Sequence, residues 1–179
     1  MLKATNLVLR FGSYSKPINF EVKPGTTLWL RGENGAGKST LLLTVAGIIK
    51  PKSGSVEAVQ NTFSYAPQKP TFVFGIQTKR VLELAGVDAA NPLIAKLGIE
   101  SFLNTPVTEL SGGEAQRVHV AIALNQDASY VLLDEPFASQ DSDSIQRIKR
   151  EIAEAKTQGK IFIIASHIQI EAEETIALD

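Results

Sequence analysis

The sequence predicts an α/β fold with a mostly parallel sheet, and two patterns support this prediction. Three runs are almost uniformly apolar, as strands buried on both faces of a parallel sheet are; they are TTLWLR (26–31), YVLLD (130–134) and KIFIIAS (160–166). Between the last two lies a helical pattern, residues 141–159, whose apolar stripe is Ile145, Ile148, Ile152 and Ala155. Strands that alternate with helices in this way define the α/β class.

The N-terminal region predicts short antiparallel strands beside that sheet. The segments LKATNLVLRF (2–11), INFEV (18–22) and GSVEAV (54–59) alternate between apolar and polar residues. Prolines and glycines punctuate them, as turns between hairpin strands require. We therefore expect an N-terminal antiparallel β subdomain.

Composition excludes several classes of protein. The chain has 179 residues, which suits one domain, and its 18 Lys and Arg nearly balance 19 Asp and Glu. A net charge of −1 gives no general attraction for nucleic acid, so no nucleic-acid partner is expected. There is no cysteine, which excludes disulfides and thiolate metal sites and fits the cytoplasm. The most apolar stretch, 41–49, is far shorter than the roughly 20 residues of a membrane-spanning helix.

The segment GENGAGKST (32–40) predicts a phosphate-binding loop, the Walker A motif of the P-loop NTPase fold. It follows the buried strand 26–31 and precedes a helix predicted over 38–49. Glycines allow successive backbone amides to converge on a polyphosphate, and the helix N-terminus adds positive potential. Lys38 is expected to reach the β- and γ-phosphates and Ser39 to hold Mg²⁺. The alternative is an ordinary glycine-rich turn before a helix.

Two carboxylates end the buried strand 130–134. Asp134 and Glu135 lie at the carboxyl edge of the predicted sheet, where ligands of open α/β sheets collect. Asp134 suits the hold on Mg²⁺, and Glu135 suits acceptance of a proton from an attacking water. An acidic strand-to-turn junction before Pro136 is the alternative.

Five motifs together resemble the nucleotide-binding subunit of ATP-binding cassette (ABC) transporters. In order they are GENGAGKST (32–40), the glutamine loop YAPQKP (65–70), the signature LSGGE (110–114) with Arg117, VLLDEP (131–136) and IIASH (163–167). The resemblance implies ATP hydrolysed at the interface of a homodimer or heterodimer, with Mg²⁺ held by Ser39, Gln68 and Asp134. It also implies a separate transmembrane permease that keeps the subunit at the cytoplasmic face of the cell membrane.

The signature predicts a helix start with two compatible roles. Read as S-x-x-E, SGGE is a capping box between Ser111 and Glu114. Gly112 and Gly113 also leave amides open to an anion at the helix N-terminus. By resemblance, Ser111, Gly112 and Gly113 contact the γ-phosphate held by Lys38 of the opposite subunit, with Glu114 and Asp141 contributing in trans.

The resemblance assigns the remaining nucleotide contacts. On the P-loop they are Asn34, Gly35, Ala36, Gly37, Lys38, Ser39 and Thr40. Gln68 is expected to contact Mg²⁺ and the water, and His167 to bind the γ-phosphate and position that water; a surface glutamine and an ordinary histidine are the alternatives. Phe11 is expected to stack on adenine, with Tyr14 as its competitor. His119, within the signature helix, is interpreted as packing or surface.

Three features depart from the family pattern. Glu114 replaces the usual signature glutamine, which places a carboxylate near a polyanion unless the capping box engages it. FASQD (137–141) differs from the common turn at that place, so communication between the two sites is expected to differ. Residues 69–110 predict a reduced helical subdomain between the core segments 1–68 and 111–179. TIALD (175–179) is expected to form the last strand of the sheet, with no appended domain.

The segment after the glutamine loop, and the function of the chain as a whole, each have two interpretations. Phe72, Val73 and Phe74 follow the glutamine loop and could receive a helix of the permease, although clustered aromatics are equally expected in a core. A transporter ATPase is the first functional hypothesis. The alternative is a soluble ABC-type ATPase that acts as an ATP-gated clamp or assembly factor, for example of the iron–sulfur scaffold type.

Overall fold

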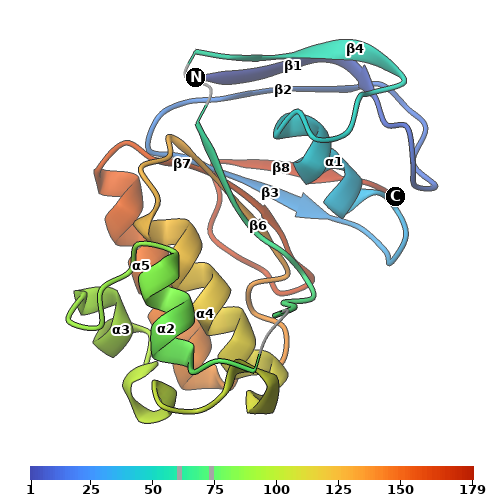
Figure 1. The fold of residues 1–179 in the computed structure, drawn as a ribbon. Coiled ribbons are helices and arrows are strands. Elements are labelled where there is room, and N and C mark those ends of the chain that lie inside the picture. The colour runs from blue at the N-terminus through green and yellow to red at the C-terminus, as the bar shows by residue number, and fades with distance from the viewer. Residues whose placement is uncertain (60–61, 73–74) are drawn as a thin grey trace.

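The computed structural model describes residues 1–59, 62–72 and 75–179 (Figure 1). The strands are β1 (Leu2–Val8), β2 (Ile18–Val22), β3 (Thr27–Arg31), β4 (Ser53–Ala58), β5 (Phe63–Ala66), β6 (Tyr130–Asp134), β7 (Ile161–Ala165) and β8 (Glu174–Ala177). The helices are α1 (Lys38–Val45), α2 (Thr78–Leu84), α3 (Pro92–Lys96), α4 (Gly112–Asn125) and α5 (Ser142–Thr157), with 3₁₀ turns η1 (Glu100–Phe102) and η2 (Val107–Glu109).

The predicted parallel sheet is confirmed. Its strand order is β5-β6-β7-β3-β8, and all its pairings are parallel. Every residue of β6 and β7 is buried. Ala165 pairs with Leu30 on one side and with Asp134 on the other. The loops after β3, β6 and β7 therefore leave the sheet at one edge, side by side.

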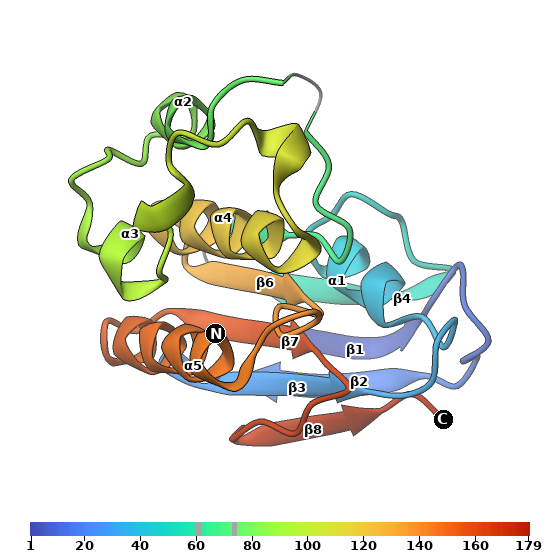
Figure 2. The ribbon, with the colours of Figure 1, turned by 90° about the horizontal axis from the view of Figure 1, so that it is seen from below.

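The sheet separates two apolar cores. On β6, Val131 and Leu133 belong to a cluster with the buried faces of α4 and α5, whereas Tyr130 and Leu132 belong to a second cluster with α1 and the N-terminal strands. This alternation follows from the two-residue period of a strand. Helices cover one face of the sheet and α1 with a second sheet covers the other (Figures 1 and 2).

The predicted antiparallel region forms that second sheet, in the order β2-β1-β4. The pairing of β1 with β4 shifts between Thr5 and Val8. At this shift Gly54 approaches β1 so closely that a Cβ there would lie 2.2 Å from the carbonyl oxygen of Asn6. Only glycine fits this contact, and its φ of +84° suits glycine as well.

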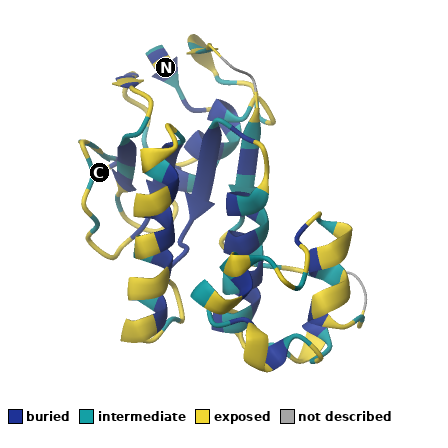
Figure 3. Ribbon diagram, turned by 90° about the vertical axis from the view of Figure 1, so that its left-hand side faces the viewer, coloured by how far each residue is buried: buried dark blue, intermediate teal, exposed yellow. Residues whose placement is uncertain are grey.

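Helix α5 follows the predicted stripe. Ile148, Ile152 and Ala155 are buried, and Figure 3 shows the buried and exposed faces of the helices. The Asp141 side chain accepts a hydrogen bond from the Ser144 amide (2.7 Å) and caps the helix. Gly159, just past the end, has φ +86°.

Helix α1 is shorter than the predicted 38–49 because a Schellman motif ends it. Gly47 adopts φ +75°, its amide donates to Thr44 O (3.0 Å), and the Ile48 amide donates to Leu43 O (2.9 Å). These bonds satisfy the last carbonyls of the helix. The glycine therefore turns the chain toward β4.

Short helices follow the glutamine loop, where the sequence predicts helical material. Helices α2 and α3 and the turn η1 pack through Leu82, Ile94 and Phe102 on the cluster that includes α4. The proposed subdomain limits, 69–110 against 1–68 and 111–179, remain predictions. In the described part of the chain, no helix combines the length and apolarity that a bilayer crossing requires.

Candidate nucleotide-binding site

The P-loop leads directly from β3 into α1. Gly37, the P-loop residue just before α1, is the N-cap of the helix with φ 118° and ψ 14°, and no side chain caps the helix. Gly35 also has positive φ, +84°. The first amides of α1 thus have no side-chain acceptor, which makes this end of the helix a site for an anion.

Lys38 lies buried inside this loop, 7% exposed. Its Nζ donates to the carbonyl oxygens of Gly32 (2.7 Å) and Glu33 (3.1 Å). The same atom is 3.9 Å from Glu135 Oε1. The chain itself therefore supplies oxygen atoms for the ammonium group.

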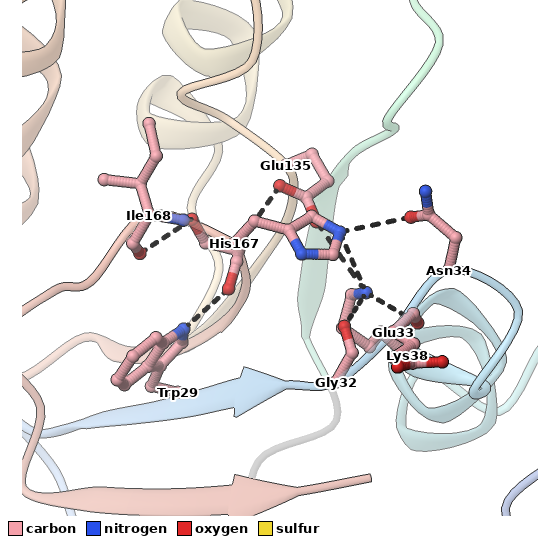
Figure 4. Close-up of polar contacts among 9 residues, drawn as sticks. Trp29, Gly32, Glu33, Asn34, Lys38, Glu135, His167 and Ile168 are labelled. Atoms are coloured by element: carbon pink, nitrogen blue, oxygen red, sulfur yellow. Dashed lines mark hydrogen bonds and ion pairs between the residues drawn. The ribbon is translucent and has the colours of Figure 1, made fainter. Parts of the chain in front are cut away.

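Glu135 and His167 form a pair across the sheet edge (Figure 4). The His167 amide donates to Glu135 Oε2 (3.2 Å), and His167 Nε2 lies 3.3 Å from Glu135 Oε1. Glu135 is 6% exposed and has φ +50°, a backbone conformation that costs a non-glycine residue about 1–2 kcal/mol. Strain of this kind concentrates at functional sites.

Three groups compete for the single Nε2 of His167. Besides Glu135, they are Asn34 Oδ1 at 3.1 Å and Lys38 Nζ at 3.3 Å. A ring nitrogen either donates to an oxygen or accepts from an ammonium group, so the tautomer decides which contact forms. The half-exposed ring can thus exchange partners when the charge beside it changes.

Asp134 is buried next to Ser39. Tyr65 Oη donates to Asp134 Oδ2 (3.2 Å). Burial raises the pKa of Asp134, against the opposing effects of hydrogen bonds from Ser39 and Tyr65 and the charge of Lys38. Burial, together with the charge of Asp134, raises the pKa of the Tyr65 phenol.

One cavity of about 210 Å³ joins these groups. Its lining includes the P-loop, Ser39, Gln68, Asp134 and Glu135. This volume is below the roughly 300 Å³ of small ligand pockets, so it suits the phosphates of a nucleotide and not its base. The predicted phosphate residues other than Ala36, the predicted magnesium residues and Glu135 line this cavity, and His167 contacts Glu135 beside it.

The donors fit the Mg²⁺ expected here. A hydroxyl, an amide oxygen and a carboxylate are hard oxygen ligands, which Mg²⁺ prefers. The described residues contain no cluster of three or more His, Cys, Asp or Glu that could hold a metal by itself. Mg²⁺ is commonly bound through one or two carboxylates together with substrate phosphates and waters.

Phe11 and Tyr14 differ in exposure. The loop that carries them is tied to the P-loop by hydrogen bonds from Ser13 N to Gly35 O (3.1 Å) and from Tyr14 N to Ala36 O (3.2 Å). Phe11 is 58% exposed, whereas Tyr14 is partly buried against the N-terminal core. Phe11 is therefore the more accessible of the two rings, and the stacking of Phe11 or Tyr14 on adenine remains a prediction.

The predicted capping box of the signature is confirmed. The Ser111 amide and hydroxyl each donate to Glu114 Oε2 (2.8 Å), and the Glu114 amide donates to Ser111 Oγ (3.3 Å). These bonds from Ser111 lower the pKa of Glu114. Ser111 and Gly112 are exposed. Among the residues that the structure describes, none of the signature lines the cavity next to the P-loop.

The family model described as ABC transporter matches residues 15–138. This chain belongs to that family. Its relatives include the zinc import ATP-binding protein ZnuC of Halorhodospira halophila, 33% identical over all of this chain and 74% of the relative. The manganese transport system ATP-binding protein MntB of Bacillus subtilis is 29% identical over 88% of this chain and 72% of its own length.

The fold of the ABC family is also found among solved structures. A dimeric ATP-binding cassette in a post-hydrolysis state, bound to ADP and Pi, superposes with a TM-score of 0.77 and 23% identity. The superposition covers 94% of this chain and 88% of that one. At this identity the likeness concerns the fold alone.

Sequence reasoning missed a link between the ABC signature and the loop after Glu135. Gln140 Nε2 donates to Gly113 O (2.8 Å), and Arg117 Nη1 donates to Gln140 Oε1 (3.1 Å). A Cβ on Gly113 would lie 2.5 Å from Ser139 O. Only the departure of FASQD from the family pattern could have drawn attention to Gln140.

The predicted permease-docking segment is described only in part. Phe72 is partly buried against the core around α4, and its ring centroid lies 4.9 Å from that of His119. Burial lowers the pKa of this histidine, in agreement with a packing role. At Phe72 these contacts favour the core interpretation, while Val73 and Phe74 lie outside the described residues.

Proposed function

We propose that this chain hydrolyses MgATP as one half of an ABC dimer and thereby drives a membrane permease. The observation that supports this most is the separation of two anion-binding helix ends. The P-loop end opens into the cavity with the carboxylates, whereas Ser111 and Gly112 at the signature end are exposed and, among the described residues, do not line that cavity. Two copies arranged head to tail would bring each signature to the other copy's nucleotide.

The P-loop residues Asn34, Gly35, Ala36, Gly37, Lys38, Ser39 and Thr40 would hold the phosphates. Lys38 would exchange its contacts with Gly32 and Glu33 oxygens for phosphate oxygens. Ser39, Asp134 and Gln68 would hold Mg²⁺. When bound, that ion neutralises charge that develops on the phosphoryl oxygens. Phe11 would stack on the adenine.

Glu135 would act as the general base. Its buried Oε1 lies 3.3 Å from His167 Nε2 and 3.9 Å from Lys38 Nζ, and a carboxylate oxygen retains further lone-pair capacity to accept a proton from water. If the Lys38 side chain moved toward the phosphates, its ammonium group would also leave Glu135 Oε1, which now lies 3.9 Å from it. His167 and Gln68 would position the water and the γ-phosphate.

The second copy would complete the site. Ser111, Gly112 and Gly113 would donate to the γ-phosphate across the interface, with Glu114 and Asp141 beside them. The Ser111 bonds engage the Glu114 carboxylate, and this reduces its repulsion of the phosphates.

A cytoplasmic location at the inner face of the cell membrane follows from the permease partner. The names of ZnuC and MntB support a divalent metal ion as the cargo of the complex. Deletion of the gene should then lower uptake of Zn²⁺ or Mn²⁺, and wild type but not Lys38→Ala should restore it. Unchanged uptake of both ions would contradict this cargo.

Isolation of the tagged protein from its native membranes tests the transporter assignment. We expect a protein with several membrane spans to co-purify with it, and ATP hydrolysis per molecule to fall on dilution as dimers dissociate. A soluble complex in place of the permease would contradict transport and support the clamp or assembly-factor alternative.

A further inference from the structure

A second cavity is lined by residues of α5, by Phe137 after Glu135 and by Ile170 and Glu171 after His167. It measures about 350 Å³ and opens between α5 and the segment after His167. This volume is within the roughly 300–1,000 Å³ range of small-molecule sites. None of the residues assigned above to nucleotide, magnesium or catalysis lines it within the described ranges.

The floor of this cavity is apolar, and its residues belong to the buried core. Phe137, Ile152 and Ile164 line it and are 1%, 7% and 1% exposed, and Ile170 adds a partly buried side chain. Thr27 also lines the cavity. It is 1% exposed, and its hydroxyl has no hydrogen-bond partner among the described residues. A floor of this composition suits a rigid apolar body with polar atoms at its edge.

The rim is cationic. Lys149, Arg150 and Lys156 line the cavity against a single lining carboxylate, Glu171. Lys156 is already engaged, because its Nζ donates to both oxygens of Glu173 at 2.8 and 3.0 Å. Two cations of the rim, Lys149 and Arg150, therefore remain against one carboxylate, that of Glu171.

Both remaining cations are placed for a ligand on the apolar floor. Lys149 Nζ lies 5.9 Å from the centroid of the Phe137 ring, and among the described residues its hydrogen bond is a long one, 3.3 Å, to Gln169 O. Arg150 donates from Nε to Gln146 O (3.3 Å), and its two terminal nitrogens make no hydrogen bond to the described residues. A guanidinium with two open nitrogens matches a carboxylate in bidentate geometry.

We propose that this cavity binds an amphipathic carboxylate, with its apolar body over Phe137 and Ile164 and its anionic group on Arg150 and Lys149. The apolar floor alone would accept a neutral apolar molecule as well as a carboxylate. The two cations of the rim are what favour the carboxylate. The proposal goes beyond the hydrolysis of ATP. It concerns a cavity that shares no lining residue with the nucleotide cavity among the described residues.

Isothermal titration calorimetry with 2-naphthoate tests this site. The comparison ligand is 2-naphthylmethanol, which has the same body without the charge. We expect one naphthoate per chain, bound at least roughly tenfold more tightly than the alcohol, because a charge-assisted pair contributes about that factor. Equal affinity of the two compounds would overturn the proposal.

Matched variants locate the ligand. Arg150→Glu should weaken naphthoate binding by roughly tenfold or more, whereas Arg147→Glu, the same change on α5 outside the cavity, should leave it unchanged. Ala153→Trp, at an exposed lining position, should block the site while far-ultraviolet circular dichroism shows an intact fold. Binding that resists Arg150→Glu or Ala153→Trp would refute the assignment. Lys38→Ala should retain full binding, so failure of the ATPase proposal would leave this result unaffected.

Discussion

The P-loop and the signature helix both present a helix N-terminus, yet their surroundings differ. Around the P-loop, Lys38, Asp134 and Glu135 are buried and make contacts with neighbouring groups of the same chain. At the signature, Ser111 and Gly112 are exposed, and the contacts of Ser111 are mostly with Glu114 three residues away. The first end is built into a cavity; the second is prepared locally and needs a partner surface.

This difference teaches how one chain can carry two half-sites. Buried charges define the P-loop half, so changes there should affect chemistry most. The signature half depends on glycine geometry and a local cap, so small substitutions at its glycines or at Glu114 should change stability by modest amounts, whereas a bulky cation at Ser111 should block the other copy's site. The predictions below test that contrast.

Lys38→Ala should have the largest effect. It removes the positive charge from the phosphate cavity, so we expect the ATPase rate to fall by more than about 10³-fold and ATP affinity to fall as well. Steady-state phosphate release and nucleotide titration measure both. Lys3→Ala, on β1, is the control and should leave both unchanged. Substantial ATP turnover by Lys38→Ala would contradict the assignment of phosphate binding to the P-loop.

Glu135→Gln should separate chemistry from binding. The amide cannot take the proton of the attacking water, so we expect a rate loss of about 10²–10⁴-fold with ATP binding preserved. Size-exclusion chromatography with ATP should show a trapped dimer. The control Glu57→Gln, on β4, should behave as wild type. If Glu135→Gln kept its turnover, another group would have to be the base.

The two signature glycines should respond differently to alanine. A Cβ on Gly113 would meet Ser139 O at 2.5 Å, so Gly113→Ala should lower the free energy of unfolding by about 1–3 kcal/mol. A Cβ on Gly112 would meet only the Ser139 side chain, at 3.9 Å, so Gly112→Ala should fold normally. Urea denaturation compares the pair. Equal stability of the two variants would remove the proposed contact between signature and loop.

Glu114→Ala should have the smallest effect, about 0.5–1 kcal/mol of unfolding free energy at neutral pH, through loss of the capping box. Hydrogen bonds from Ser111 lower the pKa of Glu114 in the folded state. The contribution is thus complete above the unfolded pKa of the carboxyl and is lost as pH falls through the lower folded value. Denaturation at neutral and acidic pH should show the variant and wild type converging; Glu109→Ala is the control. A difference constant with pH would rule out the carboxylate as its source.

Local features were predictable from the sequence. The central strands follow from uniform apolar runs, the P-loop from spacing of Gly and Lys, and the capping box from Ser111 and Glu114 three residues apart. Each depends on residues close in the chain, so pattern alone carries the information. The end of α1 was missed because Gly47 lies within an otherwise helical pattern and ends the helix through a positive φ.

Long-range contacts were not predictable. The competition of Lys38, Asn34 and Glu135 for His167 joins segments up to 133 residues apart. The Gln140 link to Gly113 depends on how α4 packs beside the loop after β6, which no periodicity records. The second cavity likewise arises only when β3, α5 and the segment after β7 lie together.

Mixing two inactive variants tests the shared site most directly. Lys38→Ala keeps an intact signature, and Ser111→Arg keeps an intact P-loop, so each alone should be inactive. In an equal mixture, half the dimers pair one of each and contain one complete site, which predicts recovery of roughly a quarter of wild-type ATPase activity. A mixture that stays inactive while heterodimers form, or Ser111→Arg that is fully active alone, would contradict ATP bound between two copies.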